Sequence, residues 1–323
     1  MASTLQQQIS VEKLSSDLFT SSFNPGRMGN TKNIAYGGCA VGVGIEAASQ
    51  TVSPNYVLYS AMGNYLGPAI TERKLMCSIR RVRDTRTFAT RVVEIGQEQH
   101  DGVTRLCMIM VVDFQVKEKD SLLVYSATPQ TRYSPVEKCL DTSETIRGMV
   151  SKGEVTEELA EVFRVQFDLL GRFFECRGTP EGVISNNLNG LAKGAKTPQD
   201  GMDLTSKTSA DWFRCSHPLE MRCSHYAGLG FIMDGALSFL PLAHNAMFLD
   251  DAGACSSLEF AFRLFDTDLD LTRWHLREMK TVTGGNGRTY SESRLWDSEG
   301  NMVANMTQQS ILRPLNHKRK AAL

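Results

Sequence analysis

Two stretches of this chain carry the same order of hydrophobic and polar positions. Each opens with a nearly all-apolar segment of helical period, continues with a β-rich run, and ends in three strand-like segments separated by Gly- or Asp-containing turns. The first stretch predicts a helix at 36–49 and strands at 55–67, 74–83, 87–95 and 103–116. The second predicts a helix at 225–243 and strands at 256–265, 275–282, 288–296 and 301–312. This repeated order indicates a diverged internal repeat.

A helix that is apolar on nearly all sides has to be enclosed, and an antiparallel sheet that wraps around it can do this. One such helix in one such sheet is the hotdog arrangement, so two in tandem predict an α+β double hotdog. We expect an N-terminal hotdog at 1–118, a connector at 119–205 and a C-terminal hotdog at 206–323. The connector is polar, with a helix predicted at 156–174 and a loop at 178–201.

Composition and charge exclude several classes of protein. The chain has 323 residues, of which 41% are hydrophobic and 22% charged, which is ordinary for a globular protein large enough for two cores. A net charge of −1 gives no general attraction to nucleic acid or to anionic membranes. The apolar runs are far shorter than the roughly 20 residues of a membrane span, and the first residues do not resemble a secretory signal. We therefore expect a cytoplasmic protein.

The cysteines and the C-terminus add little chemistry. Eight cysteines are scattered without any Cys-x-x-Cys pair, which favours reduced thiols over disulfides or a zinc site, and no metal is expected. The last three residues, Ala-Ala-Leu, are only a weak match to a peroxisomal signal such as Ser-Lys-Leu. A peroxisomal location is the alternative that this match leaves open.

Asp234 is the residue that first indicates chemistry. It lies in HYAGLGFIMDGALSFLPLA (225–243), a segment that is otherwise almost wholly apolar. Burying an ionised carboxylate requires a polar partner, a water or a raised pKa, and the same conditions produce a catalytic base. The alternative is that Asp234 lies at a helix end or faces solvent.

Several short motifs, in their order along the chain, resemble the type II acyl-CoA thioesterases. Tyr36-Gly37-Gly38 resembles the Phe-Gly-Gly-Gln that opens the first helix of that family, and Asp234 with Phe239-Leu240-Pro241 resembles its Asp-x-x-Phe-Leu-Pro. Ser257-Leu258-Glu259 and the closing segment 303–313 match later motifs. The resemblance covers both halves and their order but not the connector, and it implies a double hotdog that hydrolyses thioesters.

The resemblance also implies a catalytic set. In that family an Asp, a Thr or Ser, and a Gln hold the water that attacks the thioester, and the corresponding positions here are Asp234, Ser257 and Gln308. Asp234 would take the proton, while Ser257 and Gln308 would orient the water or bind the developing oxyanion. A slip of one residue in strand register would replace Ser257 by Ser256, or Gln308 by Gln309.

Other positions are candidates for binding the substrate. Gly37 and Gly38 could donate backbone N–H groups at a helix start, although close packing of helix on sheet explains them equally. Arg83 and Arg86 could bind phosphates, but a solvated strand face is the favoured explanation of the arginines. Met62 stands where the family often has a His. In the first repeat, the positions that correspond to Asp234 and Gln308 fall within 41–45 and 107–112. Neither range contains a carboxylate or an amide, so one catalytic set per chain is expected.

The sequence therefore predicts an acyl-CoA thioesterase whose substrate is an acyl-CoA or an acyl-carrier thioester. It would need no cofactor, because coenzyme A is part of the substrate. By family analogy it would form a homo-oligomer. Two rival functions remain open: a biosynthetic hotdog enzyme that releases, transfers or cyclises a bound acyl or polyketide intermediate, and a non-catalytic acyl-binding protein. Acyl chain length and pathway are not specified.

Overall fold

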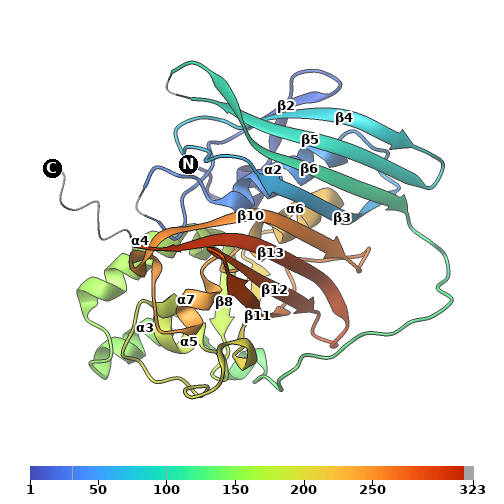
Figure 1. The fold of residues 1–323 in the computed structure, drawn as a ribbon. Coiled ribbons are helices and arrows are strands. Elements are labelled where there is room, and N and C mark those ends of the chain that lie inside the picture. The colour runs from blue at the N-terminus through green and yellow to red at the C-terminus, as the bar shows by residue number, and fades with distance from the viewer. Residues whose placement is uncertain (31, 100, 316–323) are drawn as a thin grey trace.

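The computed structural model describes residues 1–30, 32–99 and 101–315, and these residues form one sheet of thirteen antiparallel strands (Figure 1). The strand order is β1-β2-β4-β5-β6-β3-β10-β13-β12-β11-β9-β8-β7. The strands are β1 (Val11–Lys13), β2 (Leu18–Ser21), β3 (Tyr56–Tyr65), β4 (Met76–Asp84), β5 (Phe88–Glu98), β6 (Thr104–Val116), β7 (Leu140–Asp141), β8 (Phe174–Gly178), β9 (Ser209–Cys215), β10 (Ala252–Leu264), β11 (His275–Gly285), β12 (Arg288–Trp296) and β13 (Met302–Pro314). The predicted C-terminal signal lies outside the described residues.

The strand order of one half repeats that of the other. The first half runs inward from its edge as β1-β2-β4-β5-β6-β3, and the second, inside the short edge strand β7, runs β8-β9-β11-β12-β13-β10. The halves join where Gly63 of β3 pairs with Phe260 of β10. The predicted double hotdog is confirmed. The strand pairs β1–β2 and β8–β9, which precede the main helix of each half, were not predicted, because β1, β2 and β8 are too short to show a period of two and β9 does not alternate strictly.

The main helices of the two halves lie side by side within the curved sheet (Figure 1). The helices are α1 (Leu5–Ile9), α2 (Gly37–Ser49), α3 (Thr142–Ser151), α4 (Glu157–Phe173), α5 (Ile184–Asn187), α6 (Arg222–Met233) and α7 (Leu240–His244). Helices α2 and α6 run antiparallel, since Gly38 at the start of α2 meets Phe231 near the end of α6 and Gly42 meets Ala227. A Cβ on Gly38 would lie 2.4 Å from the Phe231 carbonyl oxygen, so this close approach requires glycine.

One predicted element is wrong in its extent. The single helix predicted at 225–243 is broken, because α6 ends at Met233 and α7 begins only at Leu240. Ala236 has a φ of 78°, which an L-residue rarely adopts, and Pro241 lies in the first turn of α7. The break turns the chain directly after Asp234.

The connector contains the predicted helix, which the structure places at 157–173 as α4. Thr156 caps α4 with its side chain, and Asp141 and Glu144 form a capping box on α3. These helices bury a second, smaller core that includes Ile146 and Phe163. The strand β8 also falls within the predicted connector but pairs with β9 of the second half, and the domain boundaries themselves remain a prediction.

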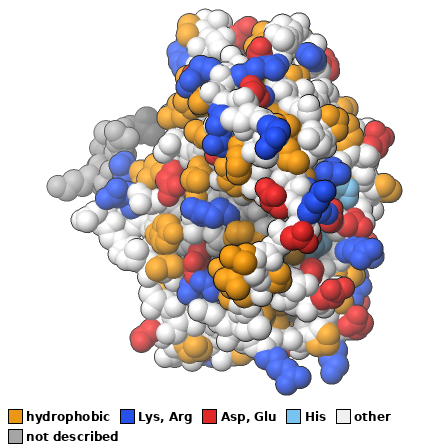
Figure 2. All heavy atoms as spheres, turned by 90° about the vertical axis from the view of Figure 1, so that its right-hand side faces the viewer, with side chains coloured by type: hydrophobic (Ala, Val, Ile, Leu, Met, Phe, Trp, Pro, Cys, Tyr) orange, Lys and Arg blue, Asp and Glu red, His pale blue; other side chains and the backbone are white. Residues whose placement is uncertain are grey.

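An extended segment, residues 117–128, links β6 to the connector along the right-hand side of Figure 1 and is exposed throughout. Figure 2 shows that face, where hydrophobic side chains lie among charged ones. Leu122, Val124 and Tyr125 are each about nine-tenths exposed or more. Among the described residues, no helix is long and apolar enough to cross a membrane.

Candidate active site

Asp234 directly follows Met233, the last residue of α6, and occupies the C-cap position. The sequence left open that Asp234 lies at a helix end or faces solvent. It does lie at a helix end, but it does not face solvent, because it is only 5% exposed. The break after Met233 allows the carboxylate to turn out of the helix axis toward the sheet. The position of the carboxylate therefore depends on the helix break after Met233, which the apolar pattern of the sequence did not predict.

Two side chains hold the end of α6 in place. The Tyr36 hydroxyl donates to the Phe231 carbonyl at 2.6 Å, and the Arg277 guanidinium donates to the Ile232 carbonyl at 2.9 Å. Arg277, which is buried, is itself paired with the partly buried Asp211 at 2.7 Å. Carbonyls of the last helical turn lack partners within the helix, so these donors stabilise the turn that positions Asp234.

The carboxylate of Asp234 accepts hydrogen bonds from both halves of the chain. The Tyr65 hydroxyl of β3 donates to Oδ1 at 2.6 Å, and the Gln308 amide nitrogen of β13 donates to the same oxygen at 2.7 Å. The backbone N–H of Gly38 also donates to the carboxylate. Because Gly38 lies in the first turn of α2, the positive end of that helix dipole faces Asp234.

Burial raises the pKa of Asp234 to about 6, although the hydrogen bonds from Tyr65, Gln308 and Gly38 act in the opposite direction. Desolvation disfavours the charged form, whereas donors to the carboxylate favour it. A carboxyl group that titrates near neutral pH can both accept a proton and return it. Burial also raises the pKa of Tyr65 well above its usual value, so its hydroxyl stays protonated as a donor.

If Asp234 is a base, kcat/KM should follow its ionisation. We expect activity to be level above pH 6 and to fall about tenfold per pH unit well below it, because the protonated acid cannot accept a proton. Tyr65→Phe removes a donor that lowers the pKa of Asp234, so the inflection should move to higher pH. Steady-state hydrolysis across pH measures both.

Tyr59→Phe is the matched control for that experiment. Tyr59 lies on the same strand but packs its ring against Phe88, away from Asp234. Its pH profile should coincide with that of the wild type. An unshifted inflection in Tyr65→Phe would show that another group controls the rate.

The strand register shows which member of each pair, Ser256 or Ser257 and Gln308 or Gln309, lies on the inner face of the sheet. Gln308 is fully buried on the inner face of β13, while Gln309 lies on the outer face beside Arg288. Ser257 pairs with Ser310, which shares the inner face with Gln308. The structure therefore places Ser257 and Gln308 on one face. It shows Gln308 in contact with Asp234, whereas it shows no hydrogen bond between the Ser257 hydroxyl and the other described residues.

Gly37 and Gly38 lie at the start of α2, directly against the carboxylate. A Cβ on Gly37 would lie 2.9 Å from Asp234 Oδ2 and 2.8 Å from the Tyr65 ring. A side chain at Gly37 would push the carboxylate away from the helix start, whereas one at Gly38 would meet the Phe231 carbonyl and the Tyr36 ring. Gly37 is thus explained by the close approach of backbone to Asp234, and Gly38 by the packing of α2 on α6.

Three other predicted positions lie elsewhere. Met62 is 43% exposed on the outer face of β3, because the pleat turns it away from the face that carries Tyr65. Arg83 lies 3.7 Å from Asp113, which pairs with Ser60 rather than with the Tyr65 end of β3, and Arg86 is exposed in the adjacent turn. The structure does not bring these three side chains to Asp234.

Tyr65 is the site residue that the sequence analysis did not single out. It is the last residue of β3, and only its position in the fold brings its hydroxyl to Asp234. The signal that could have identified it is a polar-tipped aromatic residue at the end of a largely buried strand. Such a residue needs a hydrogen-bond partner.

Two cavities border the chain that follows Asp234. One of about 660 Å³ lies between the connector and the second half and reaches Gly235, Ala236 and Arg277. The other, of about 430 Å³, lies beside α7 and is lined by Pro241 and Leu242. Both volumes are within the range of small-molecule sites.

Comparison with known proteins agrees in both halves. The family model of the acyl-CoA thioesterase N-terminal domain matches residues 24–115, and that of the C-terminal domain matches residues 175–312. Acyl-CoA thioesterase 2 of Haemophilus influenzae is 21% identical over 281 residues, covering 86% of this chain and 87% of that protein.

Solved structures share the fold. An acyl-CoA thioesterase II, TesB2, from Mycobacterium marinum has a TM-score of 0.67 and 18% identity, covering 97% of this chain and 99% of its own. A conserved protein with a hot dog fold from Alicyclobacillus acidocaldarius has a TM-score of 0.69 and 12% identity, covering 97% and 98% of the two chains.

Proposed function

This chain belongs to the acyl-CoA thioesterase family, and on that premise we propose that Asp234 is the base that activates water for thioester hydrolysis. The chain is an acyl-CoA thioesterase, which converts an acyl-CoA to a free acid and CoA. One observation supports the role of Asp234 above all others: a buried carboxylate with a pKa of about 6 is held by donors from both halves.

The proposed reaction has two steps. A water attacks the thioester carbonyl carbon while Asp234 takes one of its protons, which gives a tetrahedral oxyanion. The oxyanion then collapses, the carbon–sulfur bond breaks, and Asp234 returns the proton to the departing sulfur. The products are the carboxylic acid and the CoA thiol, and Asp234 is again a carboxylate.

The neighbouring groups have separate roles in this proposal. The Gln308 amide has a second N–H, which can hold the attacking water while the first holds Asp234. The Ser257 hydroxyl, on the same face, is proposed to orient the same water. Gly37 and Gly38 are proposed to turn the positive end of α2 toward the developing oxyanion.

Steady-state hydrolysis of a panel of acyl-CoAs of increasing chain length tests this function. Wild-type protein should release free CoA from some members of the panel with saturation kinetics. A chain that binds these thioesters but cleaves none of them would exclude the hydrolase and leave an acyl-binding protein.

We also propose that the chain self-associates. The support is that large apolar residues of the 117–128 segment, and Met62 and Val111 on the outer face of the sheet, are exposed, and exposed apolar patches often mark protein–protein contacts. Light scattering in solution would give a mass above that of one chain.

A further inference from the structure

The inner face of the second half carries a row of hydroxyl groups beside the site. On β12, Thr289, Ser291 and Ser293 are all buried, with the outward-facing residues alternating between them. Across the sheet, Ser291 pairs with Gln308 and Thr289 pairs with Ser310. We call Ser257, Thr281, Thr289, Ser291, Ser293 and Ser310 the hydroxyl strip.

The corresponding face of the first half is apolar between the buried Arg91 and Gln97 of β5. On β5 and β6 the inward positions include Val93, Ile95, Met108, Met110 and Val112, all at most 1% exposed. Because the two halves share one fold, the strand structure alone does not require hydroxyl groups at these positions. The strip is particular to the half that carries Asp234.

Two hydroxyls of the strip have no partner among the described residues. Thr289 Oγ1 and Ser291 Oγ are buried without a hydrogen bond, although the residues are only 7% and 1% exposed. Buried polar groups are nearly always paired, and leaving one unpaired costs stability. Thr289 lines the cavity beside α7, whereas Ser291 lies next to it on the inner face, opposite Gln308. The two unpaired hydroxyls are therefore candidates for binding a ligand that carries oxygen.

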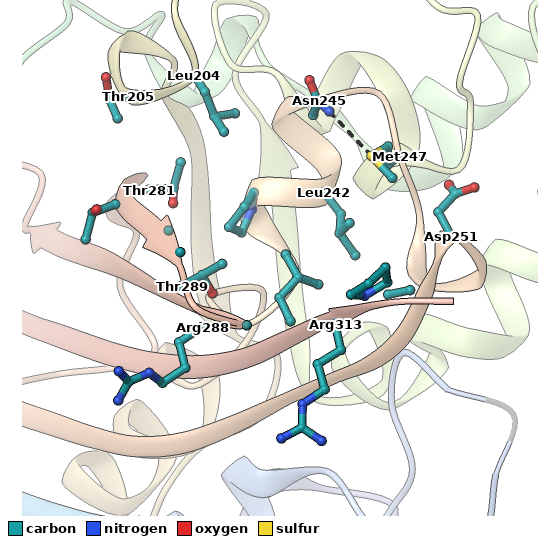
Figure 3. A pocket seen from close by; sticks show the side chains of 18 residues that line it. Leu204, Thr205, Leu242, Asn245, Met247, Asp251, Thr281, Arg288, Thr289 and Arg313 are labelled. Carbon is teal, nitrogen blue, oxygen red and sulfur yellow. Dashed lines mark hydrogen bonds between the residues drawn. The ribbon is translucent and has the colours of Figure 1, made fainter. Parts of the chain in front are cut away.

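Strand register places the strip between the Asp234–Gln308 pair and the cavity beside α7, of whose lining Thr281 and Thr289 are members. Ser310 donates to the Gln308 amide oxygen at 3.4 Å, and Gln308 donates to Asp234 at 2.7 Å. Thr289, opposite Ser310, lines the cavity of about 430 Å³. Figure 3 shows Leu242, Thr281 and Thr289 gathered around that cavity, while Arg288 and Arg313 point away from it.

We infer that this cavity takes the acyl group and that the preferred acyl group carries oxygen, as hydroxyl or carbonyl, along its first carbons; the inference rests on the proposed function. Ser291 lies directly opposite Gln308 and so is close to the reacting carbonyl. Thr289 lies two residues before Ser291 on β12, which places the two residues about 6.6 Å apart along the strand. The apolar wall of Leu242 and Leu312 contacts the carbon chain between the oxygens.

A matched pair of substrates tests the inference. Octanoyl-CoA and 3-hydroxyoctanoyl-CoA differ by one hydroxyl, and the wild type should hydrolyse the hydroxylated substrate with a kcat/KM roughly tenfold higher, as expected for one added hydrogen bond. The double variant Thr289→Val with Ser291→Ala removes the two hydroxyls with little change of volume, and the ratio should fall to about one. Thr307→Val, on the outer face of β13, should keep the wild-type ratio.

Three outcomes are distinguishable. If the wild type hydrolyses octanoyl-CoA as fast as 3-hydroxyoctanoyl-CoA or faster, the inference is overturned and the thioesterase function stands. The same conclusion follows if the double variant keeps the wild-type ratio of the two kcat/KM values. If neither substrate is hydrolysed, the proposed function fails for these substrates. Calorimetric binding of octyl-CoA and 3-hydroxyoctyl-CoA thioethers then decides the inference, since only tighter binding of the hydroxylated thioether supports it.

Discussion

Asp234→Asn should lower kcat for acyl-CoA hydrolysis by roughly 10²–10⁴-fold, the usual loss when a general base is removed. Asparagine has nearly the same shape as aspartate, and its amide oxygen can still accept the hydrogen bonds from Tyr65 and Gln308. What it cannot do is accept a proton from water. Substrate binding should change much less than kcat, because the charge acts mainly in the transition state.

The same variant should be more stable than the wild type at pH 7.5. The pKa of Asp234 is raised from 3.8 to about 6 by folding, so the stability of the wild type is lost as pH rises through this interval. Asparagine is neutral at every pH, so the variant does not lose this stability. The difference corresponds to about 1–3 kcal/mol in the free energy of unfolding. Chemical denaturation at pH 7.5 and at pH 4 measures the difference, which should shrink at the lower pH.

Asp113→Asn is the control for both effects. Asp113 is a partly buried carboxylate of the first half that accepts from Thr90 at 2.5 Å. Its removal should leave kcat near the wild-type value. Full activity in Asp234→Asn would remove Asp234 from the mechanism, and lower stability at pH 7.5 would contradict its raised pKa.

Gln308→Glu should reduce activity at pH 7 by about 10²-fold. It would place a second carboxyl group about 2.7 Å from Asp234 Oδ1, where two negative charges cannot both be accommodated. The pair would then share one proton near neutral pH, and the pair rather than either residue would set the apparent pKa. Activity should recover partly at higher pH, which a pH–rate profile would show.

Gln309→Glu is the matched control, one residue along the same strand. Gln309 faces outward and accepts from Arg288, so an added negative charge there lies on the other side of the sheet. Activity near that of the wild type is expected. If both variants lose activity equally, the effect comes from the strand and not from Asp234.

The sequence predicted the repeated order of elements because long apolar and alternating segments carry a clear period. It did not predict β1–β2 or β8–β9: β1, β2 and β8 are only three to five residues long, and β9, with seven, does not alternate strictly between apolar and polar residues. Nor did it predict the end of α6 at Met233, since the apolar pattern continues through the break. Gly235 and Pro241 were the local signs of that break.

The candidate site was predicted in part. Asp234 was identifiable because a lone carboxylate in an apolar run is conspicuous. Ser257 and Gln308 came from the resemblance, but each had a polar neighbour, and only the register of β10 with β13 separates Ser257 from Ser256. Tyr65 contacts Asp234 from 169 residues away, a distance in sequence over which no local pattern carries information.

The two halves of the chain are joined through the exposed 117–128 segment, and their contacts resemble those between two subunits of a dimer. Asp234 and Gln308 come from one half, Tyr65 and Gly38 from the other, and the halves are held together by the β3–β10 ladder and by the packing of α2 on α6. The peptide bonds of the segment contribute little to that junction. New chain ends opened there, by a protease or by circular permutation, would leave the four groups assembled, so that covalent continuity matters less to this enzyme than complementarity between its halves.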